Sequence, residues 1–183
     1  MKALWLGPDG PLGHILAKGA TSVVRREDSI DCKYILRGGF GFAVSYGYRH
    51  LIQPDVINAL DGRIVNLHIS FLPWNRGADP NLWSFLEDTP KGVSIHWIDA
   101  GLDTGDLVAQ REITMCLDDT LATSYSRLER GILTLFEEWW ARLLEGSAPR
   151  TPQPPGGSKH TSKDKEPYLH YLTDSWNTPV AGL

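Results

Sequence analysis

Short apolar segments typical of β-strands alternate along this chain with segments of helical periodicity. Strands are predicted at residues 3–6, 42–45, 62–70, 92–99 and 106–113. Short helices are predicted within residues 7–19, 53–60 and 79–88. The last of these helices has Asp79 as its predicted cap and Pro80 in its first turn. This alternation predicts an α/β domain with a mostly parallel sheet flanked by helices. Residues 20–40 contain too few apolar residues for an assignment.

One long amphipathic helix is predicted to begin at Asp119 or Thr120 and to end at Gly146. Its apolar residues recur at steps of three and four, the period of a helix with one buried face. They are Leu121, Tyr125, Leu128, Ile132, Leu135, Trp139 and Leu143. The Trp139–Trp140 pair is interpreted as core packing rather than as a ligand platform, because large aromatic side chains are mostly buried.

Length and composition fit one globular domain. The chain has 183 residues, of which 42% are hydrophobic and 22% are charged. A net charge of −4 without a basic run argues against a nucleic-acid partner. The apolar run at the N-terminus is too short for a signal peptide or a membrane span. Cys32 and Cys116 lack metal-like spacing, which favours a reduced, cytoplasmic protein, although the sequence leaves a disulfide between them open.

The strand predicted at residues 62–70 carries three polar side chains among apolar ones. Asn66, His68 and Ser70 occupy alternating positions, so we expect them on one face of the strand. A buried polar group without a partner costs about 1–3 kcal/mol. This face must therefore meet other polar groups, water or a ligand. Ligands of α/β sheets bind at the carboxyl ends of strands, and these residues stand at that end.

A second polar group of residues follows the next predicted strand. His96 lies near the end of that strand, and Asp99 and Asp103 follow in a glycine-rich loop. An amide, an imidazole and a carboxylate at one sheet edge suit the attack of a neutral amine on a carbonyl. The amide and a protonated imidazole can donate hydrogen bonds to the oxyanion. The carboxylate can keep the imidazole charged and accept a proton through water. No Gly-x-Ser-x-Gly elbow surrounds Ser70, so no serine nucleophile is predicted.

Together these segments resemble the core of the 10-formyltetrahydrofolate-dependent formyltransferases. That family includes the glycinamide ribonucleotide, methionyl-tRNA and sugar-nucleotide N-formyltransferases. Its pattern is Asn-x-His-x-Ser-x-Leu-Pro with a later Gly, then Ser/Thr-x-His, then an Asp before a glycine-rich turn. The matching residues here are Asn66, His68, Ser70, Leu72, Pro73, Gly77, Ser94, His96 and Asp103. The resemblance implies a Rossmann-like formyltransferase core.

The resemblance also implies roles for the matched residues. Asn66 and His68 would bind the oxyanion, and Asp103 would orient His68 and carry the proton of the amine. Ser70 and His96 would support the site, with a core histidine bonded to the backbone as an equal alternative for His96. The pterin ring of the co-substrate, 10-formyltetrahydrofolate, would lie against the main chain of two loops. The residues implied there are His50, Leu51, Ile52, Asp99, Ala100 and Leu102.

The segment before Asn66 is shorter than in most relatives. We therefore predict one domain over residues 1–183, with a shortened N-terminal part (1–60), a catalytic core (61–146) and a C-terminal extension (147–183). This short form looks like the small sugar-nucleotide formyltransferases and the formylation domains of peptide synthetases. The expected acceptor is a small-molecule amine, first an amino sugar nucleotide, with an amino-acid-derived or carrier-bound amine as the alternative. No nucleic acid or membrane partner is expected, and the oligomeric state stays open.

Two other functions stay open from the sequence. One is hydrolysis of 10-formyltetrahydrofolate, although hydrolases of this kind usually carry a small regulatory domain before the catalytic one. The other is a non-catalytic folate- or nucleotide-binding protein, in which the shortened N-terminal part has lost some of the pocket. The joint presence of Asn66, His68 and Asp103 argues against the latter, because binding alone does not need all three. The sequence carries no metal signature, and the chemistry needs no metal.

Overall fold

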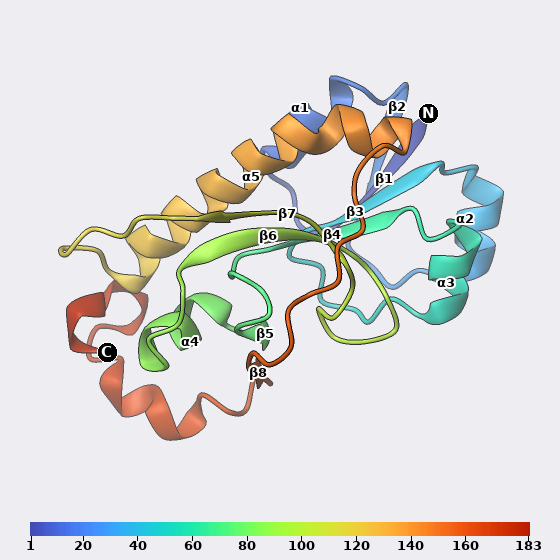
Figure 1. Cartoon of the computed structure of the whole chain (residues 1–183). Helices are drawn as coiled ribbons and strands as arrows, with labels where there is room; N and C mark the ends of the chain where they lie inside the picture. The colour runs from blue at the N-terminus through green and yellow to red at the C-terminus, as the bar shows by residue number, and fades with distance from the viewer.

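The computed structural model describes residues 1–183 as a six-stranded sheet with helices on both faces and a small two-stranded sheet beside it (Figure 1). The strands are β1 (Lys2–Leu6), β2 (Ser22–Arg26), β3 (Phe42–Ser45), β4 (Ile64–His68), β5 (Arg76–Gly77), β6 (Gly92–Trp97), β7 (Leu107–Glu112) and β8 (Lys159–His160). The α-helices are α1 (Leu12–Ala17), α2 (Cys32–Gly38), α3 (Pro54–Ala59), α4 (Pro80–Leu86) and α5 (Leu121–Glu145). Three short 3-10 helices end the chain, at Glu166–Tyr171, Ser175–Asn177 and Val180–Gly182.

The large sheet has the strand order β2-β1-β3-β4-β6-β7 and is mixed. The four N-terminal strands pair in parallel, whereas β6 runs antiparallel to β4 and β7 runs antiparallel to β6. The α/β class is confirmed, and the parallel character is limited to the first four strands. A short loop connects β6 to β7, and antiparallel neighbours need no long crossover.

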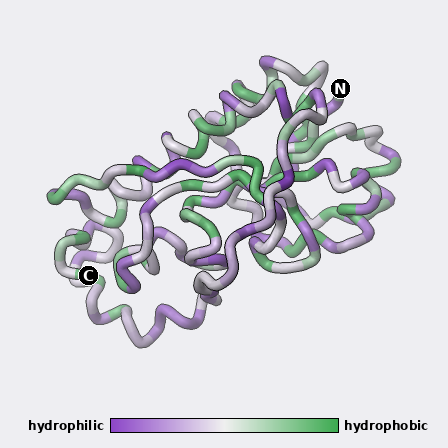
Figure 2. Tube along the Cα trace, in the orientation of Figure 1, coloured by the Kyte–Doolittle hydropathy of each residue, from purple (hydrophilic) through white to green (hydrophobic).

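Each face of the sheet has its own apolar core. Helix α5 covers one face, where it packs on residues such as Phe42, Val65 and Ile95, while α2 and α3 cover the other face (Figure 1). Apolar segments of the trace coincide with these central strands (Figure 2). The predicted periodicity of α5 holds at most positions, but Tyr125 is 44% exposed. Of the two adjacent tryptophans, Trp140 is buried in the core and Trp139 is half-buried against it.

The two predicted caps differ in outcome. Thr120 caps α5 by accepting a hydrogen bond from the Thr123 amide (3.2 Å), and Gly146 ends the helix in a left-handed conformation. The predicted cap of α4 is wrong in its chemistry. Asp79 precedes Pro80 as expected, but it has a φ of 51° and makes no capping hydrogen bond. Its carboxylate instead accepts a hydrogen bond from Lys165 (2.8 Å).

The N-terminal part contains complete strand–helix units built from short helices. Residues 20–40, which had no assignment from sequence, form β2 and α2. Strand β2 lies at the edge of the sheet, where none of its residues is fully buried. An edge strand needs few apolar residues, which explains the weak signal. The division of the domain at residues 60 and 146 stays a prediction.

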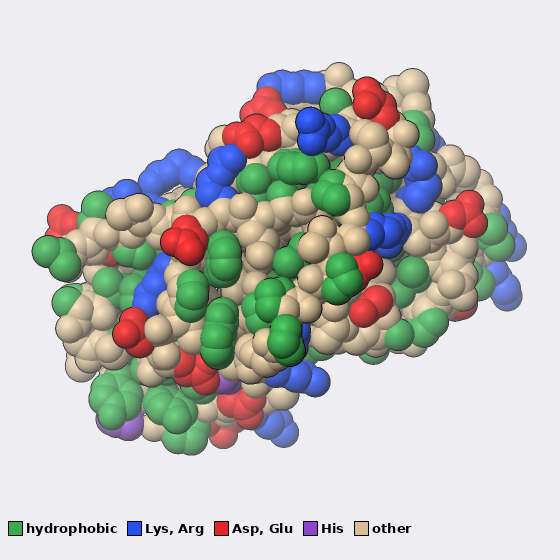
Figure 3. Space-filling model, viewed as in Figure 1, with side chains coloured by type: hydrophobic (Ala, Val, Ile, Leu, Met, Phe, Trp, Pro, Cys, Tyr) green, Lys and Arg blue, Asp and Glu red, His purple; other side chains and the backbone are tan.

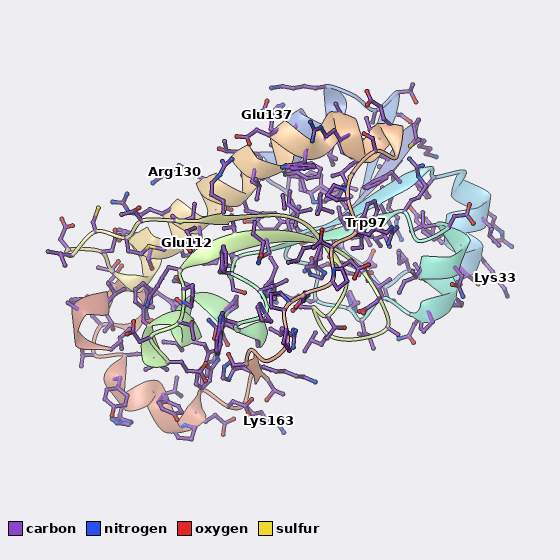
Figure 4. All side chains as sticks on the ribbon, in the orientation of Figure 1. Lys33, Trp97, Glu112, Arg130, Glu137 and Lys163 are labelled. Atoms are coloured by element: carbon purple, nitrogen blue, oxygen red, sulfur yellow. The ribbon has the colours of Figure 1, made fainter.

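The segment after α5 crosses back over the end of the sheet (Figure 1). Thr151 pairs with Leu107, and β8 then pairs in parallel with β5. Trp97, labelled in Figure 4, donates its indole hydrogen bond to the carbonyl of Pro149 in this segment (2.8 Å).

Positive and negative side chains are interspersed on the face shown in Figure 3. None of the helices is both long and apolar enough to span a bilayer.

Candidate functional site

Asn66 and His68 lie on one face of β4, as the alternation predicts. Val65 and Leu67, on either side of Asn66 in the sequence, point to the opposite face and belong to the core under α5. Asn66 lies between Ser45 of β3 and His96 of β6 in the sheet register. Because β3 ends at Ser45, Asn66 stands at the carboxyl edge of the parallel strands.

Ser70 does not continue this face, because β4 ends at His68. Its hydroxyl donates a hydrogen bond to the carbonyl of Trp74 (2.7 Å), and its carbonyl accepts one from the hydroxyl of Ser94 (2.7 Å). The side chain of Ser70 is buried and lines neither of the two cavities described below. Ser70 therefore stabilises the turn that follows β4.

Asp103 brings the predicted polar groups together. Its Oδ1 atom accepts a hydrogen bond from Nδ2 of Asn66 (3.1 Å) and lies 3.3 Å from Nε2 of His96. Its Oδ2 atom accepts a hydrogen bond from the backbone amide of Gly77 (2.8 Å) and lies 3.7 Å from Nδ1 of His68. Residues from β4, β5, β6 and the loop after β6 thus meet around one carboxylate.

The two imidazoles occupy different positions around Asp103. His68 is buried, and its Nε2 atom lies 3.0 Å from the carbonyl of Asn75. His96 lines a cavity, with its Nε2 atom 3.3 Å from Nδ2 of Asn66 and its Nδ1 atom 2.9 Å from the carbonyl of Trp97. His96 thus has the backbone contact of a core histidine and also faces the site.

The electrostatics of the pair His68 and Asp103 follow from burial and from close polar contacts. Burial lowers the pKa of His68, the nearby His96 lowers it further, and the charge of Asp103 only partly opposes this. Burial alone would raise the pKa of Asp103, but the two imidazoles and the Gly77 amide hold that pKa well below its usual range. These directions favour an ionised Asp103 and an uncharged His68 in the resting site, whereas the expectation from the sequence is that Asp103 keeps the imidazole charged.

A cavity of about 310 Å³ opens beside these groups. Asn66, His96 and Asp103 line one part of it. The rest of its wall includes five of the six residues predicted to hold the pterin, which are His50, Leu51, Ile52, Asp99 and Leu102. Ala100 lies in the same loop but does not line the cavity. The Asp99 carboxylate accepts hydrogen bonds from the Gly101 amide (3.0 Å) and the Thr104 hydroxyl (2.7 Å), so it also shapes this loop.

Sequence reasoning missed a second, larger cavity of about 540 Å³. This cavity lies at the N-terminal ends of α4 and α5, and Ile69, the residue after His68, forms part of its wall. Its polar and aromatic lining residues include Asp79, Tyr125, Ser126, Glu129 and Trp176. Tyr125 and Glu129 looked like ordinary positions of an amphipathic helix. The exposure of Tyr125, an apolar position of the helical pattern, is visible only in the folded chain.

The family model described as formyl transferase matches residues 13–133. The chain belongs to the formyl transferase family. This membership confirms the resemblance and the enzyme class that the sequence motifs predict.

The whole structure is similar to that of the formyltransferase PseJ from Anoxybacillus kamchatkensis. That crystal structure holds UDP-4,6-dideoxy-4-formamido-L-AltNAc and tetrahydrofolate. The two chains are 50% identical with a TM-score of 0.95, and the match covers 100% of this chain and 97% of that chain. A sugar N-formyltransferase from Shewanella sp FDAARGOS_354 is 18% identical with a TM-score of 0.81, covering 99% of this chain and 85% of that one. At that identity the likeness shows the fold alone.

Curated relatives match over part of their length. The cytosolic 10-formyltetrahydrofolate dehydrogenase of Pongo abelii is 40% identical over 136 residues, which are 72% of this chain and 14% of that protein. A methionyl-tRNA formyltransferase of Burkholderia orbicola (strain MC0-3) is 34% identical over 136 residues, which are 73% of this chain and 40% of that protein. The chain thus spans about 14% of the length of the first of these relatives.

Proposed function

We propose that this chain transfers the formyl group of 10-formyltetrahydrofolate to the primary amine of a nucleotide-linked amino sugar. The observation that carries the proposal is the convergence of Asn66, His96 and Asp103 on the cavity formed by the 50–52 and 99–103 loops. The likeness to PseJ supports both substrates, because that chain is 50% identical in a match that covers 97% of it and was crystallised with a formamido sugar nucleotide and tetrahydrofolate.

The smaller cavity suits the folate. Leu51 and Leu102 line it and yet are 68% and 39% exposed, so a flat heterocycle bound there would cover apolar surface that now faces water. Small-molecule sites commonly combine such apolar walls with a few fixed polar groups. We assign the pterin to these loops and the formyl carbon to the position beside Asn66 and Asp103.

The larger cavity suits the sugar acceptor. Its carboxylates and hydroxyls can bind sugar hydroxyl groups, and Tyr125 and Trp176 offer aromatic surface. Glu129 accepts a hydrogen bond from the hydroxyl of Tyr46 (3.3 Å), the residue that follows β3. Burial raises the pKa of Tyr46, so this hydroxyl keeps its proton. Ile69, which follows the last residue of β4, forms part of the wall of this cavity.

The chemistry follows from the groups at the end of β4. The amine attacks the formyl carbon as a free base, and the carbonyl electrons move onto oxygen. Nδ2 of Asn66 donates a hydrogen bond to the developing oxyanion. The attacking nitrogen gives its proton to Asp103 through water. The new negative charge favours the passage of this proton to Nδ1 of His68, 3.7 Å from the Asp103 carboxylate, and His68 then also donates to the oxyanion. Collapse of the intermediate breaks the bond to N10 of the folate, which takes up the same proton as it leaves, so that Asp103 and His68 return to their resting states.

The direct test is an acceptor screen after a binding measurement. Calorimetric titration with 5-formyltetrahydrofolate should show binding of about micromolar strength. Incubation with 10-formyltetrahydrofolate and UDP-linked amino sugars should then give a formamido product, detected by mass spectrometry, in step with release of tetrahydrofolate. The same assay tests the alternatives. Release without any acceptor would indicate a hydrolase, and a product only from amino acids or carrier-bound amines would move the acceptor to that class.

A further inference from the structure

One side chain from the segment after α5 binds the backbone of the loop that carries Asp103. Nε2 of Gln153 donates hydrogen bonds to the carbonyls of Asp103 (2.8 Å) and Gly105 (2.9 Å). Gln153 is half-buried, whereas its neighbours Pro152 and Pro154 are exposed. The side chain of Gln153 thus points toward the protein and binds two carbonyls of one turn, whereas a glutamine that served only solubility would point to solvent.

The orientation of Gln153 is itself fixed. Its Oε1 atom accepts hydrogen bonds from Nη2 (2.7 Å) and Nε (3.2 Å) of Arg76. Arg76 lies in β5, directly before Gly77, whose amide binds the carboxylate of Asp103. The same strand therefore holds the carboxylate of Asp103 directly and its backbone through Gln153.

The backbone conformation of Asp103 benefits from this support. Its φ is 53°, in the left-handed region, which costs free energy for residues other than glycine even though aspartate and asparagine tolerate it best. The turn is also tightly packed, since a Cβ atom on Gly105 would lie 1.8 Å from the carbonyl of Trp97. The side-chain amide of Gln153 stabilises this conformation because it binds the carbonyls of both Asp103 and Gly105.

Gln153 lines neither the smaller nor the larger cavity. It can therefore influence catalysis only through the position of Asp103. The carboxylate makes contacts of 3.1 to 3.7 Å with Asn66, His96 and His68. A small shift of the loop would break them, and a misplacement of about 1 Å can cost roughly a hundredfold in rate.

We propose that Gln153, oriented by Arg76, is a positioning residue that holds the backbone of Asp103 so that its carboxylate reaches Asn66, His68 and His96. The inference rests on the proposed function, because it concerns the same site. The C-terminal extension (147–183) would then take part in catalysis, which its loop-like sequence does not suggest.

The test compares two variants of Gln153 with a control. Gln153→Ala removes the side chain, and Gln153→Glu keeps its length and its contact with Arg76 but loses the donor to the two carbonyls. Arg150→Ala is the control, since it removes the contacts of a side chain in the same segment with the carbonyl of Gly62 and the ring of Trp97 and leaves the hydrogen bonds of Gln153 in place. We expect both Gln153 variants to lose about tenfold to a hundredfold in kcat with KM values within about twofold. The Arg150 variant should keep the wild-type kcat.

A spectroscopic readout separates this proposal from the proposed function. The imidazole ¹⁵N shifts of His68 and His96 report which ring nitrogens carry protons, and both should change in Gln153→Ala because Asp103 moves away. They should stay unchanged in Arg150→Ala. Normal imidazole shifts with normal kcat, or a loss confined to KM, would overturn the positioning role. If the wild-type chain itself transfers no formyl group, the proposed function fails, and the imidazole shifts still decide whether Gln153 positions Asp103.

Discussion

The side-chain amide of Asn66 donates a 3.1 Å hydrogen bond to the carboxylate of Asp103, 37 residues further along the chain. The amide that we assign to the oxyanion is thus bound to the proton acceptor in the resting site. A substrate carbonyl must share or replace this contact, and protonation of Asp103 during the reaction would weaken it. The donor is then released toward the oxyanion as the negative charge develops. This relationship links proton transfer to oxyanion binding and makes Asp103 the residue to change first.

Asp103→Asn should largely abolish formyl transfer while the chain stays folded. Asparagine tolerates the left-handed conformation and can still accept the hydrogen bond of the Gly77 amide. It cannot accept the proton of the amine, so the loss should appear in kcat. Steady-state kinetics with circular dichroism would check both parts. Asp106→Asn, in the same loop, is the matched control and should keep the wild-type rate. Full activity of Asp103→Asn would remove the proposed mechanism.

Asn66→Ala should lower kcat by at least about a hundredfold, the usual effect of losing one oxyanion donor. The substitution removes the hydrogen bond to Asp103 and the only amide side chain that lines the smaller cavity. Binding of 5-formyltetrahydrofolate, measured by calorimetry, should change little because the loops at residues 50–52 and 99–103 stay in place. Asn58→Ala, an exposed position, serves as the control. A rate within about twofold of the wild type would show that Asn66 does not bind the oxyanion.

The sequence predicted five of the six strands of the large sheet, the shared face of Asn66 and His68, and the loop that carries Asp103. These features leave local signals, because strand periodicity reports the face of each side chain and the motif fixes residue types. The antiparallel direction of β6 had no such signal, since periodicity does not report the direction of the partner strand. Gln153 was missed for a related reason. Its function depends on a contact between residues 50 positions apart, and its own surroundings resemble an ordinary proline-rich loop.

The free energy of unfolding should fall on acidification partly because of His68. Burial lowers its pKa below the ordinary value of 6.5, so the unfolded chain binds more protons than the folded chain as the pH falls through that value. The contribution of the uncharged His68 to the free energy of unfolding is complete above about pH 6.5 and is lost progressively below that pH. Asp103 acts in the same direction below its ordinary value of 3.8, because its folded pKa is also lowered.

Replacement of His68 by Gln should therefore flatten the dependence of unfolding free energy on pH between about pH 6.5 and pH 5. Urea denaturation at a series of pH values measures this slope. His14→Gln, at an exposed position, is the control and should leave the slope unchanged. Equal slopes for the wild type and His68→Gln would mean that His68 is not held neutral by burial.

Substitution of Trp140 should lower the stability of the chain much more than substitution of Trp139. Neither substitution should change catalysis. Trp140 is 3% exposed and packs edge-on against Phe42, with ring centroids 5.5 Å apart, and its indole donates to the carbonyl of Leu16 (3.3 Å). Trp140→Ala should cost about 3–5 kcal/mol, the usual range for a buried aromatic side chain. Trp139 is half-buried and stacks with Arg142, so Trp139→Ala should cost about 1 kcal/mol.

Urea denaturation would give both costs, and kinetics below the transition would test catalysis. Neither tryptophan lines the cavity that we assign to the folate or the one that we assign to the sugar. The folded fraction of each variant should therefore transfer formyl groups at the wild-type kcat. A raised KM for the acceptor in either variant, at full folding, would show that the pair is a ligand platform after all and that the acceptor extends along α5.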